Sequence, residues 1–306
     1  AGVVVKFKYD SNIRTKKRFI VNGILKAQGT SNSPIVFTSE YDDTYGGDTN
    51  NNGSSTVPKK GDWGYIQFNS HANGVSTFEH CVVKYGGYYY TGSYYHNYML
   101  WVNSGSSSYQ DVAIKNSLVS DSYGDGIVVS GQAAPLVDSN TIESCSIGIN
   151  YDGRLSNQVI KNNSISSCGY GIKVYKGKPV ITDNILASNS YPIHQYGPVF
   201  PSYSGNSISG NGYQVIAVSG IMQPQVPTTE EWPDVENLGL PYMVLGDITI
   251  ESNLQLTIPA GVVVKFKYDS NIRTKKRFIV NGTLKAQGTS NSPIVFTSEY
   301  DDTYGG

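Results

Sequence analysis

A short period runs through the middle of the chain and limits what it can fold into. Five segments open with Asn, followed by small polar residues and a short apolar stretch, and they start at Asn116, Asn140, Asn163, Asn184 and Asn206. A second marker, an apolar residue after Gly, Pro or Gln, recurs at nearly the same spacing, at Ile127, Ile149, Ile172, Ile193 and Val215. Self-similarity at this spacing is the signature of a solenoid, in which each repeat packs on its neighbours.

The local pattern decides which solenoid forms. Apolar residues alternate with other residues in the pairs Ile127/Val129, Ile172/Val174 and Val215/Ala217, which is the period of a β-strand. Gly, Asn and Ser interrupt the chain every few residues and leave no room for helices. The sequence therefore predicts an all-β parallel β-helix of about 22 residues per coil, with loop insertions and with inward ladders of Ile, Val and Leu.

The Asn residues at the coil starts have a structural interpretation. Asn tolerates the left-handed region of backbone conformation, and its side-chain amide can bond to the backbone of a turn. Stacked at one corner of a solenoid, such amides also bond to one another along the axis. We therefore expect an Asn ladder rather than a ligand site.

A much longer repeat joins the two ends of the chain. Residues 1–47 and 260–306 are offset by 259 positions and differ only at Ile24, which is Thr283 in the second copy. The duplicate is either a true second unit or a product of how the segment is bounded, and the single difference favours two real units. We expect a tandem array of β-helix modules.

Composition excludes some classes of partner. The 23 basic residues nearly balance the 24 acidic ones, which argues against nucleic acid. No apolar run is long enough for a membrane span. The 24 Tyr and 33 Gly are typical of a β-rich, often extracellular protein. Three Cys are too few for a disulfide scaffold, and Cys145 and Cys168, one coil apart, are expected to stack as reduced thiols.

Several motifs resemble a known family. They are LPYMVLGDITIESNLQLTIPAGVVVKF (240–266), FIVNGTLKAQGTSNSPIVFTS (278–298), DDTYGGDTNNNGSSTVPKKGDWGYIQF (42–68) and FEHCVVKYGG (78–87). The chain resembles right-handed parallel β-helix repeat proteins of the pectate-lyase-like superfamily, of the modular prokaryotic cell-surface type. The resemblance implies an extracellular or surface location and a module at 1–221, a Pro-rich junction at 222–246 and the start of a second module at 247–306. It implies little about activity, because this fold carries many functions.

The segment DTNNNG, 48–53, fits the opening of a calcium loop. Asp48, Asn50 and Asn52 occupy the positions whose oxygens converge on a cation in such loops. The position where a Glu ligand is usual is Lys59, so Asp42, Asp43 or Asp62 would have to complete the set. The alternative is a polar insertion loop without metal.

A tyrosine-rich stretch at 85–101 interrupts the coil period and is expected to project as a loop. Its candidate contact residues are Tyr88, Tyr89, Tyr90, Tyr94, Tyr95 and Tyr98. Such rings can pack on their own coil, bind a neighbouring subunit or stack on sugars. All three interpretations stay open.

A basic stretch forms a further candidate contact patch, made of Arg14, Lys16, Lys17 and Arg18. It is either a solvated face or a partner for the acidic residues near Glu40 and Asp48 on another strand or module.

No catalytic residues stand out. Asp138 and Asp183 lie near coil starts, but the coil between them offers Lys161 instead of an acid, and His71, His80, His96 and His194 share no spacing. We expect an extracellular structural protein that self-associates into a stalk, fibre, filament or sheath. The alternatives are a carbohydrate-binding adhesin module that uses the Tyr loop, and, third, a polysaccharide lyase.

Overall fold

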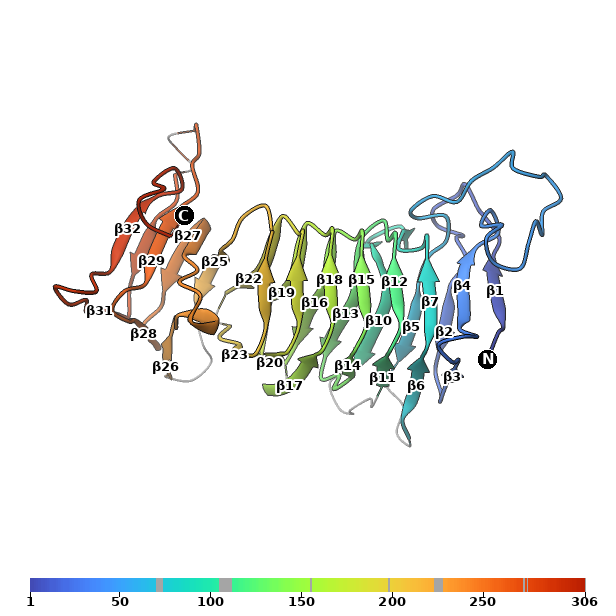
Figure 1. Cartoon of the computed structure of the whole chain (residues 1–306), viewed down its shortest axis with the longest axis horizontal. Helices are drawn as coiled ribbons and strands as arrows, with labels where there is room; N and C mark the ends of the chain where they lie inside the picture. Colours follow the sequence, from blue (N-terminus) through green and yellow to red (C-terminus); the bar gives the residue numbers. More distant parts are fainter. Residues whose placement is uncertain are drawn as a thin grey trace.

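The computed structural model describes residues 1–69, 74–104, 112–154, 156–197, 199–222, 228–271, 273 and 275–305. The described chain winds into an elongated stack of coils with the two termini near opposite ends (Figure 1). Apart from one hairpin, all of its named strands pair in parallel with strands of the coils before and after. The prediction of an all-β parallel β-helix is therefore confirmed. No helix in the described part is long and apolar enough to cross a membrane.

Three long sheets run along the stack (Figure 1). The eight-stranded sheet contains β1 (Val4–Phe7), β4 (Ile35–Ser39), β7 (Cys81–Lys84), β12 (Leu118–Ser120), β15 (Thr141–Glu143), β18 (Ser164–Ser166), β21 (Ile185–Ala187) and β24 (Ser207–Ser209). The seven-stranded sheet contains β3 (Lys26–Gln28), β6 (Ser76–Glu79), β11 (Val112–Lys115), β14 (Leu136–Asp138), β17 (Ser156–Lys161), β20 (Lys178–Thr182) and β23 (Ser202–Ser204).

The twelve-stranded sheet is the longest. It contains β2 (Phe19–Val21), β5 (Ile66–Asn69), β10 (Tyr98–Ser104), β13 (Asp125–Gly131), β16 (Ile147–Gly153), β19 (Tyr170–Val174), β22 (Tyr191–Tyr196), β25 (Ile216–Met222), β27 (Tyr242–Ile250), β29 (Val263–Phe266), β30 (Phe278–Val280) and β32 (Val295–Ser298). A three-stranded sheet near the C-terminal end contains β26 (Thr228–Glu231), β28 (Leu254–Ile258) and β31 (Thr283–Ala286), and a short 3-10 helix, η1, spans Val235–Asn237.

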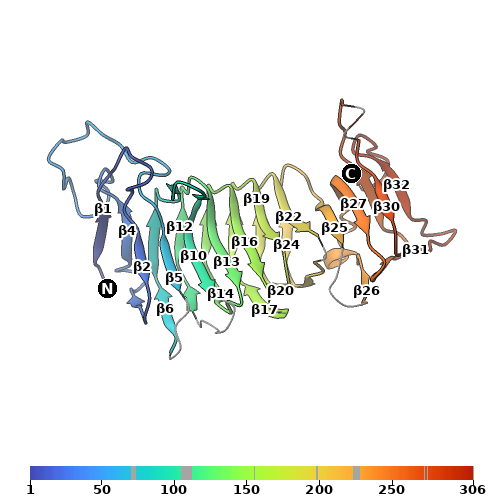
Figure 2. The ribbon, with the colours of Figure 1, turned by 180° about the vertical axis from the view of Figure 1, so that it is seen from behind.

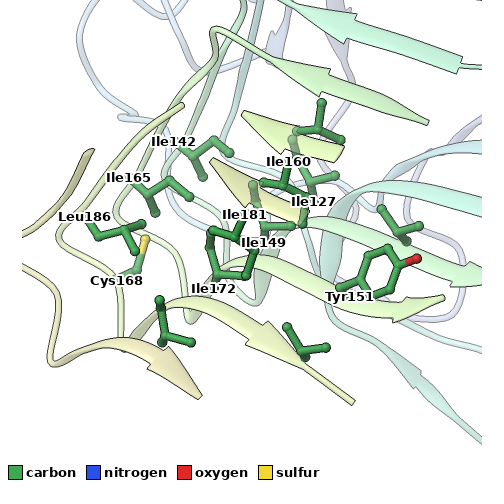
Figure 3. Close-up of a cluster of buried hydrophobic side chains, with 14 of the residues drawn as sticks. Ile127, Ile142, Ile149, Tyr151, Ile160, Ile165, Cys168, Ile172, Ile181 and Leu186 are labelled. Carbon is green, nitrogen blue, oxygen red and sulfur yellow. The ribbon is translucent and has the colours of Figure 1, made fainter. Parts of the chain in front are cut away.

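The core consists of apolar ladders that run along the axis. Ile127, Ile149 and Ile172 are paired rung by rung in the twelve-stranded sheet and are fully buried. Figure 3 shows them together with ladders from the other two long sheets, made of Ile142, Ile165 and Leu186 and of Ile160 and Ile181. Because each rung presents a similar side chain at the same place, the core continues unchanged from coil to coil.

The fifth coil differs from the expected register by one residue. Ile193 pairs with Ile216, and Gln195 pairs with Val218, so the inward pair is Ile216/Val218 instead of Val215/Ala217. In this coil the side-chain carbonyl of Gln214 accepts hydrogen bonds from the backbone and side-chain nitrogens of Asn211, both at 2.9 Å. Gln214 therefore ends a second amide ladder, in which Asn189 donates to Asn211.

The expected Asn ladder forms. Asn140, Asn163, Asn184 and Asn206 are buried, and each of the first three donates its backbone and side-chain N–H groups to the side-chain oxygen of the next Asn at 3.0 Å. Glu236 ends this ladder, since its Oε1 accepts from the backbone and side-chain nitrogens of Asn206. The bonds run along the solenoid axis and join successive coils.

Two details of the Asn prediction are wrong. The left-handed residue is the one before each ladder residue, as at Ser139 (φ 58°) and Gly205 (φ 70°), and not the ladder Asn itself. Asn116 has such a left-handed backbone (φ 48°), so Ser117 is the residue that continues the ladder, with its N–H bonded to Asn140 Oδ1. A turn of this kind has a positive φ at one residue and a buried side-chain acceptor at the next, an amide in the Asn coils and the hydroxyl of Ser117 in the first.

The cysteines are buried free thiols. Cys145 and Cys168 belong to a second corner ladder, in which the backbone N–H of Cys168 donates to Asn189 Oδ1 at 3.1 Å. The Cys168 sulfur beside it and burial together raise the pKa of the Cys145 thiol. The two residues therefore have a packing role in the structure.

The second copy of the repeated sequence folds like the first. In β29 and β32, Val263 pairs with Val295 and Phe266 with Ser298, which reproduces, 259 residues later, the register of β1 and β4. Part of the segment 222–246 is regular, because β26 and η1 lie within it, while 223–227 lie outside the described residues.

The long strand β27 joins the copy to the preceding coils. Its first half pairs with β29 and its second half with β30, while its other edge pairs with β25. The two strands have a bulge between these halves. Val218 pairs with Val244 and Gly220 with Ile248, so one residue of β25 lies opposite three residues of β27. From this point the C-terminal strands are tilted relative to the central coils in both views (Figures 1 and 2).

Candidate interaction site

The tyrosine-rich stretch forms a short antiparallel hairpin. Its strands, β8 (Tyr89–Tyr90) and β9 (Tyr95–His96), pair Tyr89 with His96 and Tyr90 with Tyr95. The turn is closed by the Thr91 N–H, which donates to the Tyr94 carbonyl at 3.0 Å, and by the Tyr94 N–H, which donates to the Thr91 hydroxyl at 3.0 Å. The stretch therefore has a defined shape of its own outside the coil ladders.

One side of this hairpin packs on the solenoid. Tyr89 is 7% exposed and meets the Tyr65 ring edge-on, with centroids 5.7 Å apart. Tyr98 packs against Tyr65 and Trp101, and its hydroxyl is hydrogen-bonded to Nδ1 of His96. Burial raises the pKa of Tyr98 and, with a smaller effect from Arg18, lowers that of His96. Both groups are therefore neutral near pH 7.

The basic stretch lies against the same hairpin. The Arg18 guanidinium is 4.2 Å from the centroid of the Tyr89 ring, and Arg14 is 5.4 Å from that of Tyr90. These are cation–π distances. The backbone also joins the two segments, because the Tyr90 N–H donates to the Ile13 carbonyl at 3.2 Å. We call Arg14, Lys16, Arg18, Tyr65, Tyr88, Tyr89 and Tyr90 the aromatic–basic cluster.

Lys16 is the buried member of this cluster. It is 7% exposed, its Nζ donates to the Gly61 carbonyl, and it lies 5.2 Å and 5.7 Å from the ring centroids of Tyr9 and Tyr88. Burial lowers its pKa, and the carboxylate of Asp62 opposes that effect. Lys17 differs, since it is exposed and pairs with Asp10 at 3.4 Å.

Sequence reasoning treated the Tyr loop and the basic stretch as separate sites and did not select Tyr65. The signal was present in the segment GDWGY (61–65), because Tyr65 stands where the proteins that the chain resembles usually have a second Gly. Its hydroxyl accepts a hydrogen bond from Arg18 Nη1 at 3.3 Å, and its ring supports Tyr89. The departure from the motif thus supplies the ring on which the cluster is built.

The tip of the hairpin is the part open to a partner. Tyr94 is 73% exposed and Tyr95 is 61% exposed, and the nearby coil residue Tyr123 is 50% exposed. Tyr88 packs against Tyr123, with centroids 4.2 Å apart. Tyr95 lies 4.5 Å from Tyr90 between ring centroids, so the rings of Tyr95 and Tyr123 are each held by a neighbouring ring.

The predicted calcium loop is folded on its own backbone. Asp48 Oδ2 accepts from the Gly53 N–H at 2.7 Å, and Asp48 Oδ1 and Asn50 Oδ1 both accept from the Asn52 N–H at 3.3 Å. These backbone hydrogen bonds, that of Gly53 above all, lower the pKa of Asp48. Asp43 Oδ1 and Asn52 Oδ1 are buried and accept no hydrogen bond.

The other acidic candidates near this loop are bonded within the protein. Asp42 accepts from the Thr38 hydroxyl at 2.6 Å, and Asp62 accepts from the Ser39 hydroxyl at 2.7 Å and the Lys59 N–H at 2.9 Å. Burial is the largest effect on Asp62 and raises its pKa. Among the described residues, no three His, Cys, Asp or Glu side chains gather as a metal site would require.

A half-buried acid that sequence reasoning missed, Asp125, lies at the start of β13 in the twelve-stranded sheet. Burial raises the pKa of Asp125 to about 6, against a lowering effect of the Asn150 amide, which donates to it at 2.7 Å. Lys173 lies between the rings of Tyr170 and Tyr175, at 5.1 Å and 4.6 Å from their centroids, and burial lowers its pKa. No motif marks these residues, because their proximity depends on strand register.

The column of rings that begins at Tyr170 on β19 is formed by rings that stack on one another. Tyr170 stacks on Tyr191 at 5.2 Å, and Tyr191 stacks on Tyr213 at 4.7 Å, with interplanar angles of 18° and 7°. Lys267 lies 4.0 Å from the centroid of Tyr213 at the end of this column. His194 stacks on Tyr170, and burial lowers its pKa to about 3. Because the faces of these Tyr rings meet each other, the column is an aromatic ladder and not an open sugar platform.

His71, another of the histidines considered from the sequence, lies outside the described residues.

Comparison with known families agrees with this geometry. The model of the right-handed beta helix region matches residues 66–222, which include the Asn ladder and the aromatic ladder up to Tyr213. The chain belongs to this family. Right-handed β-helix proteins include enzymes and non-enzymes, so membership defines the fold and not the activity. Comparisons with curated proteins and with solved structures gave no match.

Proposed function

We propose that this right-handed β-helix chain is a unit of an extracellular structural rod, in which successive units share one continuous solenoid. One observation carries the proposal. The twelve-stranded sheet passes without a break from β25 through β27 into β29 and β30, which belong to the second copy of the repeat. A unit that ends by hydrogen-bonding to the start of its own copy is suited to indefinite extension.

The unit length follows from the sheet. In the described sheet, nine strand-to-strand steps separate β2 from its copy β30. At a strand spacing of about 4.8 Å, each unit advances the rod by about 43 Å.

Electron microscopy of chains carrying one, two and three 259-residue units tests this role. We expect unbranched rods that lengthen by about 43 Å with each unit. Separate beads joined by linkers, or a length that stays constant, would show that the units do not share a solenoid.

The polar residues support a structural role over catalysis. Asp138, near a coil start, pairs with Lys161 at 3.5 Å and accepts from Asn162 at 2.8 Å. The raised pKa of Asp125 is the feature closest to a catalytic group, but its carboxylate is bonded to the Asn150 amide, and the Tyr rings farther along the sheet stack on each other. An assay for cleavage of acidic polysaccharides with calcium present is expected to show no turnover.

A carbohydrate-binding role is the second candidate, and the exposure of Tyr94 and Tyr95 favours it. Exposed aromatic faces can stack on sugar rings. If this function holds, glycan-array binding disappears in Tyr94→Ala/Tyr95→Ala and persists in Tyr300→Ala, which removes an equally exposed ring far along the chain. A chain that binds no glycan at all excludes it.

Calcium binding at 48–53 is a separate proposal. The buried oxygens of Asp43 and Asn52 that accept no hydrogen bond are the groups that support it. Calcium is expected to raise the melting temperature of the protein, with no such effect in Asp48→Ala. Equal melting temperatures in calcium and in chelator would remove the proposal.

A further inference from the structure

Four tyrosine rings, those of Tyr88, Tyr90, Tyr95 and Tyr123, form a strip from the hairpin to the neighbouring coil, which we call the tyrosine strip. Tyr95 lies 4.5 Å from Tyr90 and 6.3 Å from Tyr88 between ring centroids. Tyr88 in turn lies 4.2 Å from Tyr123. Tyr95, Tyr123 and the turn residue Tyr94 are each at least half exposed, whereas the rings of the aromatic ladder are partly buried and stack face to face. The tyrosine strip therefore offers exposed ring surface that the aromatic ladder lacks.

A basic side chain lies at each end of the tyrosine strip. At the hairpin end, Arg14 is exposed, and its guanidinium is 5.4 Å from the centroid of the Tyr90 ring. At the coil end, Lys60 is exposed and precedes Gly61, where a Cβ would lie 3.2 Å from the Tyr123 Cβ. The exposed rings therefore lie between two cations.

Neither cation has a carboxylate partner in the part of the chain that the structure describes. None of the ion pairs found there includes Arg14 or Lys60. The acid nearest to Arg14 in the sequence, Asp10, pairs with Lys17 at 3.4 Å. The Lys60 ammonium donates to the Ser144 carbonyl, a neutral group that leaves the positive charge uncompensated. Both ends of the tyrosine strip therefore offer a positive charge to a ligand.

The exposure of Arg14 is a property of its loop. Later coils pack on the segment that contains Arg14, earlier coils pack on the segment that contains its counterpart Arg273, and both side chains are exposed. Neither kind of neighbouring coil therefore covers this position.

We propose that the tyrosine strip and its two flanking cations bind an anionic polysaccharide, whose sugars carry carboxylate or sulfate groups. The inference rests on the carbohydrate-binding role proposed above and names the class of glycan. Exposed Tyr rings can stack on the faces of sugar rings. A guanidinium binds a carboxylate or a similar oxyanion through paired N–H donors. A neutral glycan would use the rings alone, so the charge complementarity favours the acidic one.

Binding of polygalacturonate and of its methyl-esterified form tests the role of charge. Both polymers have the same sugar backbone, and esterification removes the negative charge. The measurement uses the full chain and a chelator, so that calcium cannot bridge carboxylates to the loop at 48–53. At low salt the acidic polymer is expected to bind about tenfold more tightly than the esterified one. This difference is expected to shrink as salt is raised, because added ions screen exposed charges. Heparin supplies the sulfated arm.

Charge-matched variants locate the site. Arg14→Ala/Lys60→Ala is expected to lose about tenfold in affinity for the acidic polymers and to bind the esterified polymer as the unsubstituted chain does. Arg273→Ala/Lys285→Ala removes the same charge from exposed positions in the second copy. It is expected to leave binding of every polymer unchanged, because these side chains lie away from the tyrosine strip.

The rings and the sugars are tested separately from the charge. Tyr94→Ala/Tyr95→Ala is expected to bind none of the polymers, and poly-glutamate, which carries carboxylates without sugar rings, is expected to compete weakly. Equal binding of the acidic and esterified polymers would overturn the anionic inference and leave the carbohydrate-binding role standing, whereas binding of no polymer would overturn both. Equal losses in the two charge variants would overturn the site. Poly-glutamate that competes as well as polygalacturonate would overturn the glycan in favour of an acidic peptide.

Discussion

At the scale of single residues, the solenoid is held together by polar groups that bond along its axis. The buried amide of Asn163 accepts from Asn140 and donates to Asn184 and to the carbonyls of Val137 and Lys161. Each ladder Asn thus satisfies backbone groups at a corner where the strand pairing is interrupted. Because a buried donor without a partner is costly, these amides are worth more than their individual bonds suggest.

Removing one ladder amide tests this. Asn163→Ala leaves the buried N–H groups of Asn140 without their acceptor, and we expect a loss of about 3 kcal/mol in the free energy of unfolding. The control is Asn32→Ala, at an exposed turn, which is expected to change stability by less than about 0.5 kcal/mol. Urea denaturation measures both. Equal, small effects would mean that the ladder amides do not hold the coils together.

Asp125 gives a pH-dependent prediction. Its pKa is raised from 3.8 to about 6 by burial, so the folded state binds the proton more tightly than the unfolded state does. Its contribution to stability is therefore full below pH 4 and is lost as the pH rises through 6. Relative to the unsubstituted chain, Asp125→Asn is expected to gain stability between pH 4 and 6, by up to about 1.4 kcal/mol per pH unit. A stability difference that does not vary over this range would contradict the assigned burial of the carboxylate.

At the scale of elements, one sequence is placed in two surroundings. Lys16 is buried in the aromatic–basic cluster, whereas Lys275, the same residue of the second copy, is exposed. Arg18 lies on the Tyr89 ring, whereas Arg277 pairs with Asp247 of β27 at 2.6 Å. The neighbouring coil, and not the local sequence, therefore decides what each basic side chain contacts.

This pair supplies a matched comparison. Lys16→Ala removes buried packing between two Tyr rings and a donor to Gly61, and we expect a loss of about 2 kcal/mol. Lys275→Ala changes an exposed side chain and is expected to stay within about 0.5 kcal/mol. Both values come from denaturant unfolding of the full chain. Similar losses in the two variants would mean that the two copies have the same surroundings.

The part of the fold that repeats was accessible from the sequence. The regular spacings of Asn and of Ile along the chain predict the coil length and the parallel ladders, because every coil repeats the same residue types. Where the period changes, the prediction weakens. The inward pair of the fifth coil lies one residue later than expected, and Ser117 rather than Asn116 continues the ladder. The clustering of the basic stretch with the Tyr hairpin depends on long-range register, so spacing along the chain could not reveal it.

At the scale of the whole molecule, the account depends on residues 260–305 being a coil that is docked on the preceding solenoid. Amide hydrogen exchange measures this in the chain itself. The segments 19–27 and 278–286 differ only at Ile24 and Thr283, and that difference separates their peptides by mass. The first is paired with β5 and β6, and the second with β27 and β28. We predict slow exchange of comparable extent in both peptides. Rapid exchange throughout 278–286, beside a protected 19–27, would show that the second copy is not part of the solenoid.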